Sequence, residues 1–168
     1  MVYLSNIELI AMCPGTQDEM YAFVNNKRMR CGHTTGTCAA AASKAAAMAL
    51  LGEPVSKVVI ATPKGITLDL PVEDLRIEDG KASCAVRKDG GDDIDATHGT
   101  KVYAEVSRIP QGIEIDGGIG VGRVTRKGLD QPPGNAAINR VPRSMIREAL
   151  EDVSSSLGYT GGLRTVIS

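Results

Sequence analysis

The segment from Ala39 to Ala47 most constrains the fold, because seven of its nine residues are alanine. Alanine loses the least side-chain freedom on entering a helix, so the segment predicts a helix. Gly52 and Pro54 follow it and should end the helix, as a C-terminal glycine followed by proline does. Since methyl-sized side chains cover most faces, we expect a central, buried helix that packs closely on a sheet or on another helix.

A loop rich in glycine and threonine, 32–37, leads directly into this helix within the stretch 30–51. Its threonine hydroxyls can accept hydrogen bonds from the first free N–H groups of the helix. Its glycines let the backbone approach a ligand closely, and a loop at a helix N-terminus is suited to anions. The candidate binding residues are Thr34, Thr35, Gly36 and Thr37. The alternative is that the threonines only cap the helix.

Composition excludes several classes of function. A net charge of -1 lacks the basic surplus of a dedicated nucleic-acid binder, and 3% aromatic residues provide no base-stacking platform. No apolar run is long enough to span a bilayer, so we expect no membrane partner. The cysteines show no zinc-site spacing, and we find no signal sequence; we therefore predict reduced thiols and a cytoplasmic protein. The four cysteines are Cys13, Cys31, Cys38 and Cys84.

The 168 residues suffice for one domain with a core, which we place at 30–168 after an N-terminal arm at 1–29. Within the arm, 18–24 could form a short helix. A second amphipathic helix is predicted at 142–157, and Asp79-Gly80 suits a type I′ hairpin turn. We expect strands or extended segments at 57–61, 66–70, 75–78, 81–88, 101–109, 112–115, 121–125 and 163–167. The fold class is α+β: a mixed or mostly antiparallel sheet with a central alanine-rich helix and a second, C-terminal helix packed on it.

An acidic segment, 89–99, breaks all periodicity and should be a loop. Asp92, Asp93, Asp95 and His98 are close in sequence, and carboxylates so close together raise a pKa or recruit a cation. The spacing does not fit a calcium hand, and a zinc or iron site lacks a second histidine nearby, so we predict no protein-bound metal. The alternative is a turn in which the aspartates bond their own backbone.

A second glycine-rich loop spans 117–122 and includes Gly118, Gly120 and Gly122. It is not a dinucleotide fingerprint, because we expect a strand rather than a helix after it. Arg123, Arg126 and Lys127 follow the glycines, a combination suited to carboxylates or phosphates. The alternative is a solvated basic hairpin. Since the chain has no nucleophile elbow, hydrolase chemistry has no visible nucleophile.

Three motifs together resemble the CbiD family of anaerobic cobalamin biosynthesis: GHTTGTCAAAASKAA, GGDDIDATHG, and DGGIGVGRVTRKGL followed by AINRVPRSMI. They occur in the family's order. The resemblance implies a cobalt-precorrin-5B (C1)-methyltransferase that uses S-adenosylmethionine. The chain departs from the family pattern at His33, where an aromatic residue is usual, and at Ile94, where proline is common. Family members are also longer, so the chain resembles their N-terminal domain without the further C-terminal part.

The resemblance implies a corrinoid substrate fringed with carboxylates. We predict that the threonine loop and the basic residues Arg123, Arg126 and Lys127 bind those carboxylates, and that Gly118, Gly120 and Gly122 bind the methyl donor. Because the nucleophile is a ring carbon, the protein need only orient the ring and remove any proton. Candidate bases are Asp93, Asp95 and His98; the acidic loop could instead stabilise the sulfonium of the donor.

Two other readings stay open. A small-residue loop that runs into an alanine-rich helix is also typical of small-molecule kinases of the GHMP type, although no partner motif for phosphoryl transfer is visible. A non-enzymatic reading is a corrinoid-holding module. Its site would be completed by a second chain that supplies the missing part, or the chain would form a homo-oligomer.

Overall fold

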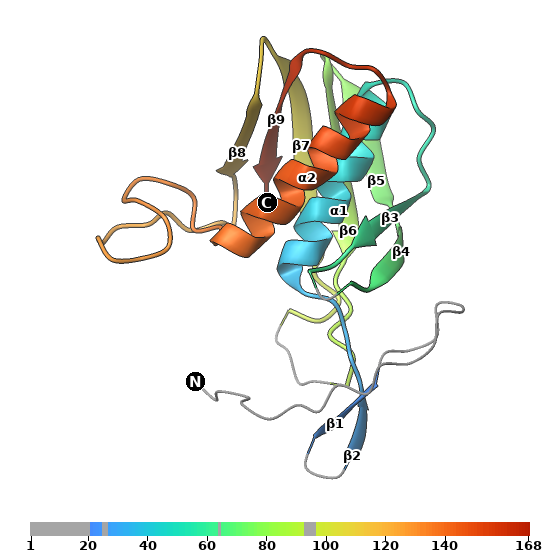
Figure 1. The fold of residues 1–168 in the computed structure, drawn as a ribbon, viewed down its shortest axis with the longest axis vertical. Coiled ribbons are helices and arrows are strands. Elements are labelled where there is room, and N and C mark those ends of the chain that lie inside the picture. Colours follow the sequence, from blue (N-terminus) through green and yellow to red (C-terminus); the bar gives the residue numbers. More distant parts are fainter. Residues whose placement is uncertain (1–20, 25–26, 64, 93–96) are drawn as a thin grey trace.

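A five-stranded sheet carries both helices on one of its faces (Figure 1). The computed structural model describes residues 21–24, 27–63, 65–92 and 97–168. The strand order is β5-β6-β7-β9-β8, and all neighbours are antiparallel except the parallel pair β8 and β9. The α+β prediction with a mixed, mostly antiparallel sheet is therefore confirmed. The strands are β5 (Glu73–Glu78), β6 (Lys81–Arg87), β7 (Lys101–Ile109), β8 (Ile113–Gly117) and β9 (Gly162–Ile167).

Two separate hairpins complete the described strands. β1 (Tyr21–Val24) pairs with β2 (Lys27–Arg30), and β3 (Lys57–Ala61) pairs with β4 (Thr67–Pro71), both antiparallel. The β3–β4 hairpin packs against the alanine-rich helix, whereas β2 leads directly into the segment before that helix (Figure 1).

The alanine-rich helix, α1 (Thr35–Leu50), is buried on almost all sides. It contacts β6 and β7 of the sheet, the hairpin strand β3 and the second helix. Its small side chains allow this close approach, because backbone-to-backbone distance is set by the bulk between elements. Inside the core, the Ser43 hydroxyl lies 3.0 Å from that of Thr165 on β9, so each buried hydroxyl has a partner. The expected central, buried helix is confirmed.

The second helix, α2 (Arg140–Ser156), lies parallel to α1. Its buried stripe has helical spacing: Met145, Ile146, Ala149, Leu150 and Val153. A methyl group placed on Gly36 would lie 2.8 Å from the Pro142 ring, and the Lys44 ammonium lies 2.7 Å from Asp152. Contacts between first turns and between later turns show that the helices run in the same direction, so their N-termini lie side by side at one end of the five-stranded sheet (Figure 1).

Two predicted elements are wrong. Tyr21–Val24, expected as the end of a short helix, is strand β1, because pairing with Lys27–Arg30 outweighs weak local helix preference; residues 18–20 lie outside the described part. Residues 121–125, expected as a strand, form only an isolated bridge between Arg123 and Ala136. The type I′ turn is confirmed, with φ of 50° at Asp79 and 74° at Gly80.

Within the described ranges, no helix combines the length and apolar character needed to cross a membrane. Cys31, Cys38 and Cys84 are free thiols, whereas Cys13 lies outside the described residues. Burial raises the pKa of Cys38 and of Cys84 to about 12, so both are protonated and unreactive.

Candidate functional site

The N-terminus of α1 keeps two backbone donors open. Thr34 is the cap residue: its hydroxyl oxygen accepts the Thr37 N–H at 3.1 Å, and its carbonyl accepts the Cys38 N–H at 3.1 Å. Across the described part of the chain, the N–H groups of Thr35 and Gly36 donate to no protein group. The first turn contains no acidic residue. This end of the helix therefore offers two donors and the positive end of a dipole to an anion.

The three threonines differ in role. Thr34 and Thr35 are exposed, whereas Thr37 is buried with its hydroxyl 3.0 Å from that of Thr34. Capping and two open N–H groups thus coexist, because the Thr34 side chain accepts only the Thr37 N–H.

One backbone donor at the N-terminus of α2 is taken by the protein itself. A carboxylate oxygen of Asp130 accepts the N–H of Arg140, the first residue of the helix. An acid in this position neutralises the positive end of the helix dipole. The Val141 N–H donates to no group among the described residues. Of the two adjacent helix ends, α1 therefore offers an external anion more open donors and has no acid bonded to its first N–H groups.

Backbone segments 30–33 and 87–92 lie against each other, antiparallel, immediately before α1, where Cys31 and Gly91 form an isolated bridge; we call this contact the crossing. The His33 N–H donates to the Asp89 carbonyl and the Asp92 N–H to the Arg30 carbonyl, both at 2.9 Å. A methyl group on Gly32 would lie 2.2 Å from the Asp89 carbonyl oxygen, and one on Gly91 would lie 2.2 Å from that of Arg30. Only glycine fits at either position, so this close backbone approach serves the protein's own chain.

Asp89 fixes the crossing electrostatically. Its carboxylate forms a two-pronged ion pair with the Arg30 guanidinium, whose second contact is 2.9 Å, and it accepts the Gly91 N–H at 2.8 Å. The Arg30 hydrogen bonds hold the pKa of Asp89 well below its usual range. The carboxylate is therefore ionised at neutral pH, and the neighbouring arginine charge is compensated.

Both histidines of the chain contact this crossing. His33 Nε2 lies 3.1 Å from the Arg87 carbonyl and 3.2 Å from the Asp89 nitrogen, so its tautomer decides which bond forms. His98 Nδ1 accepts the Gly90 N–H at 2.9 Å. The structure thus brings His98, a predicted base, to the segment that precedes α1, whereas the other predicted bases, Asp93 and Asp95, lie outside the described residues.

A buried cation that was not predicted from the sequence lies at the start of the acidic segment. Lys88 is 4% exposed, and its ammonium donates to the Thr97 hydroxyl at 2.7 Å. Its charge also acts on the Cys38 thiol in α1, opposing the rise that burial causes in the Cys38 pKa. The alternation of buried Ala82, Cys84 and Val86 along β6 places Lys88 on the helix-facing side, a signal available from the sequence.

The outer side of the loop is held by Arg87. Its guanidinium donates to both carboxylate oxygens of Glu73, at 3.0 and 2.9 Å, and to the Gly99 carbonyl at 2.9 Å. The loop is therefore tied to the helix side through Lys88 and to the sheet edge through Arg87.

In the predicted basic segment, Arg123 forms an ion pair within the protein, whereas Arg126 and Lys127 form none with the described residues. Arg123 contacts Asp116 at 2.5 Å and donates to the Gly117 carbonyl at 2.8 Å. Those bonds lower the pKa of Asp116. Arg126 and Lys127 are exposed, and neither bonds to any other described residue. They are the cations of this segment that remain available to a ligand.

The predicted donor-binding glycines differ in their surroundings. A methyl group on Gly118 would lie 2.5 Å from the Ser168 hydroxyl. Gly120 has a φ of 83°, a turn conformation, and open space around it. A methyl group on Gly122 would contact only Ala137, at 3.9 Å. The fold therefore accounts for glycine at 118 and 120 but not at 122, and binding of the methyl donor by these residues stays a prediction.

Two of the three predicted segments meet directly. Residues 33–37 adjoin the ends of the acidic loop, but no hydrogen bond or ion pair between described residues joins them to 118–127. The first turn of α2 lies between, with Pro142 against Gly36. The described parts of all three segments lie toward the end of the five-stranded sheet where both helices begin (Figure 1).

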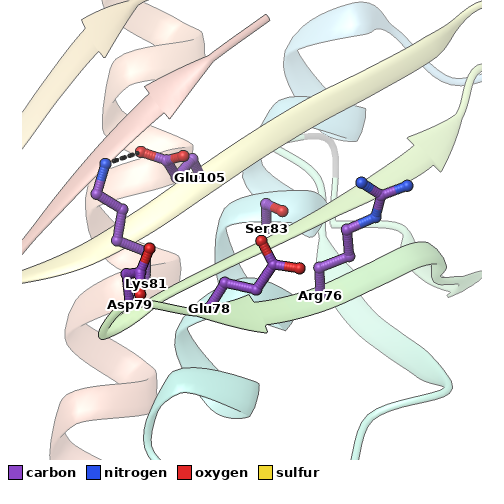
Figure 2. Close-up of a pocket in the computed structure, with 6 residues that line it drawn as sticks. All are labelled: Arg76, Glu78, Asp79, Lys81, Ser83 and Glu105. Carbon is purple, nitrogen blue, oxygen red and sulfur yellow. Dashed lines mark hydrogen bonds and ion pairs between the residues drawn. The ribbon is translucent and has the colours of Figure 1, made fainter.

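A hollow of about 260 Å³ lies elsewhere, on the sheet face opposite the helices (Figure 2). Its charged groups include the ion pair between Lys81 and Glu105, whose N–O distance is 2.9 Å. Because Lys81 and Ser83 alternate with the core residues Ala82 and Cys84, they project away from α1. The hollow is therefore separate from the helix N-termini.

The family model described as CbiD matches residues 22–168. The chain belongs to the CbiD family. This membership decides against the kinase alternative. A solved CbiD structure, a cobalamin biosynthesis protein from Archaeoglobus fulgidus, has a similar fold, with a TM-score of 0.61 and 33% identity over 88% of this chain and 46% of that chain.

Relatives named cobalt-precorrin-5B C(1)-methyltransferase share about half of the aligned residues. The protein from Ruminiclostridium cellulolyticum is 50% identical over 89% of this chain and 39% of its own length. That from Clostridium perfringens strain SM101 is 46% identical, over 89% and 40%. That from Treponema denticola is 51% identical, over 81% and 39%. The chain thus spans about two fifths of the length of these CbiD relatives.

Proposed function

We propose that this CbiD chain binds the carboxylates of cobalt-precorrin-5B and orients the ring for methylation at C1. S-adenosylmethionine is the proposed methyl donor, and the cytoplasm the proposed location. The names of the relatives and the matching family model support the substrate. The proposed role of this chain is to bind and orient the ring; among the glycines predicted to bind the donor, Gly118 packs against Ser168 and Gly120 forms a turn.

The observation that carries the proposal is the open N-terminus of α1. The free N–H groups of Thr35 and Gly36 lie beside the locked crossing of two loops, on a helix end that no acid of its own first turn neutralises. At the neighbouring N-terminus of α2, by comparison, the first N–H is already bonded to the Asp130 carboxylate. A carboxylate of the corrinoid would satisfy both open donors.

A ring with several carboxylates can engage this end of the molecule at more than one point. One exposed helix terminus contributes only about 0.3–1 kcal/mol to anion binding. Arg126 and Lys127, exposed on the segment between β8 and α2, would supply further contacts. Simultaneous contacts add avidity and also fix orientation, which can be worth roughly 7–11 kcal/mol in a group transfer.

Replacing Thr35 by proline tests the open donor. Thr35 is the first helical residue, where proline is well tolerated, and Thr34 before it already has extended backbone, with ψ of 159°. Thr35→Pro removes one N–H and the hydroxyl, whereas Thr35→Ala removes only the hydroxyl. We expect roughly tenfold weaker corrinoid binding for Thr35→Pro and a change of less than about threefold for Thr35→Ala, measured by isothermal titration calorimetry.

A matched pair of ligands completes this test. A cobalt corrinoid with free carboxylates should bind more tightly than the same corrinoid with those groups as amides, and its affinity should fall as salt rises. Equal binding of acid and amide, or equal affinity of the proline and alanine variants, would contradict an anion site at α1.

A second candidate, a corrinoid-holding module without catalysis of its own, is favoured by Gly118 and Gly120, whose close packing and turn conformation account for glycine at these positions without a methyl donor. Methyl transfer from labelled S-adenosylmethionine, measured with and without a polypeptide that carries the remaining length of the relatives, distinguishes the two. Transfer only with the added polypeptide supports the module.

A further inference from the structure

The ring of His98 has one nitrogen engaged and one open. Nδ1 accepts the Gly90 N–H at 2.9 Å, while the side chain is 57% exposed and Nε2 bonds to no group in the described residues. A nitrogen that accepts an N–H must present a lone pair, so Nδ1 carries no proton. The neutral ring then carries its proton on Nε2.

The charged form of the ring fits this geometry poorly. A proton on Nδ1 would point at the Gly90 N–H, donor against donor. The carboxylate that could receive it, Asp89 Oδ1, lies 3.7 Å away, beyond hydrogen-bond distance. Asp89 is already occupied by Arg30 and by the Gly91 N–H. The contacts around Nδ1 therefore favour the neutral ring with an Nε2–H.

The position of His98 connects this tautomer to the candidate site. Gly90, its partner, lies against the backbone of Gly32, where an added methyl group would lie 2.4 Å from the Gly90 carbonyl carbon. Gly32 precedes the first turn of α1 by only a few residues. His98 is thus held on the same crossing that borders the open helix end.

We propose that His98 is a neutral hydrogen-bond donor whose Nε2–H binds a carboxylate of the ligand, and that it is not a general base. To act as a base, the ring would have to take a proton at Nδ1, which would break its bond to Gly90. Donation from Nε2 requires no change in the protein. The identity of the ligand rests on the proposed function, whereas the tautomer does not.

Two substitutions of His98 by an amide residue distinguish the roles of the two ring nitrogens. Asparagine places an acceptor near the position of Nδ1 but offers no donor near Nε2; glutamine places an N–H near Nε2 but loses the Nδ1 acceptor. We expect His98→Asn to weaken binding of a cobalt corrinoid with free carboxylates roughly tenfold, and His98→Gln to stay within about threefold of wild type. Hydrogen exchange at the Gly90 amide should accelerate in His98→Gln and not in His98→Asn.

The reverse order of affinities would overturn the donor role and leave His98 as a loop anchor. Nitrogen NMR of histidine-labelled protein at neutral pH reads the tautomer directly, with an unprotonated Nδ1 and a protonated Nε2 expected. The opposite tautomer, with corrinoid binding intact, overturns only the inference on His98. No corrinoid binding by the wild type, with the expected tautomer observed, overturns the proposed function and the donor role together.

Discussion

Asp89 joins parts of the chain that are far apart in sequence. It receives the Arg30 guanidinium from the end of β2 and the Gly91 N–H from its own loop, and its carbonyl accepts the His33 N–H. Because the carboxylate is about one third exposed, the strength of this pair is reduced by solvent. Its value lies in fixing the crossing that leads into α1.

Replacing Asp89 by asparagine should lower the free energy of unfolding by about 1 kcal/mol at pH 7, because the ion pair is lost while an acceptor for Gly91 remains. The folded-state pKa of Asp89 is depressed, so its contribution is complete above the unfolded-state pKa of about 3.9. It is lost as pH falls from there through the lower folded-state pKa. Urea denaturation at pH 7 and at pH 3 should show the difference between variant and wild type shrinking on acidification.

Asp152→Asn is the charge-matched control for this prediction. Asp152 pairs with Lys44 on an exposed part of α2, with 64% of its side chain accessible, so at pH 7 its replacement should cost less than that of Asp89. A difference for Asp89→Asn that stays constant between the two pH values would contradict the assigned role of its charge.

At the scale of elements, the approach of α1 to α2 depends on the absence of a side chain at Gly36. A methyl group there would meet Pro142 at 2.8 Å from one ring carbon and 3.1 Å from another. The proline ring is rigid, so the helices would have to separate. The same contact keeps the two helix N-termini together at the proposed site.

Gly36→Ala should therefore destabilise the protein by about 1–2 kcal/mol. Alanine gains at most about 1 kcal/mol over glycine in helix propensity, whereas overpacking typically costs about 1–3 kcal/mol. Chemical denaturation measures the effect. The double variant Gly36→Ala/Pro142→Ala should recover most of the loss, and strictly additive effects would show that the two residues do not meet.

Local signals in the sequence predicted most of the elements. The alanine composition identified α1, the Asp79-Gly80 pair identified its hairpin, and the candidate caps included Thr34. The β1–β2 hairpin was not predicted, because Tyr21–Val24 becomes a strand only by pairing with Lys27–Arg30. Short segments have weak preferences of their own, and pairing decides them.

The candidate site was harder to predict from the sequence, because its main contacts join segments that are far apart in the chain. Gly32 was expected to allow a ligand to approach; in the fold it allows the backbone at Asp89 to approach, and a sequence cannot distinguish the two. Gly118 illustrates the same ambiguity against Ser168. The structure brings the described ends of the acidic loop beside the threonine loop, whereas the first turn of α2 separates the basic segment from them.

At the scale of the whole molecule, the charges are distributed unevenly between the open sheet face and the helix end. On the open face, carboxylates balance the cations. Lys81 contacts Glu105 at 2.9 Å and Lys101 contacts Glu73 at 3.0 Å. Arg76, which has no ion pair among the described residues, lines the hollow together with Glu78 and Asp79. Such a face presents little net field to a distant anion. The helix end combines free N–H groups at α1 with the exposed Arg126 and Lys127, so anions should be attracted there rather than to the hollow.

Substitutions that remove one positive charge from each region test this asymmetry. Arg126→Gln should weaken binding of a cobalt corrinoid with free carboxylates about two- to fivefold, and should reduce the salt dependence of binding, because a screened but available cation is lost. Lys81→Gln, at the hollow on the open face (Figure 2), should leave the affinity unchanged and alter the free energy of unfolding by less than about 1 kcal/mol. Both variants change the net charge equally, so a nonspecific effect of charge would weaken both alike. Weaker binding for Lys81→Gln alone would place the ligand on the open sheet face and remove it from the helix N-termini.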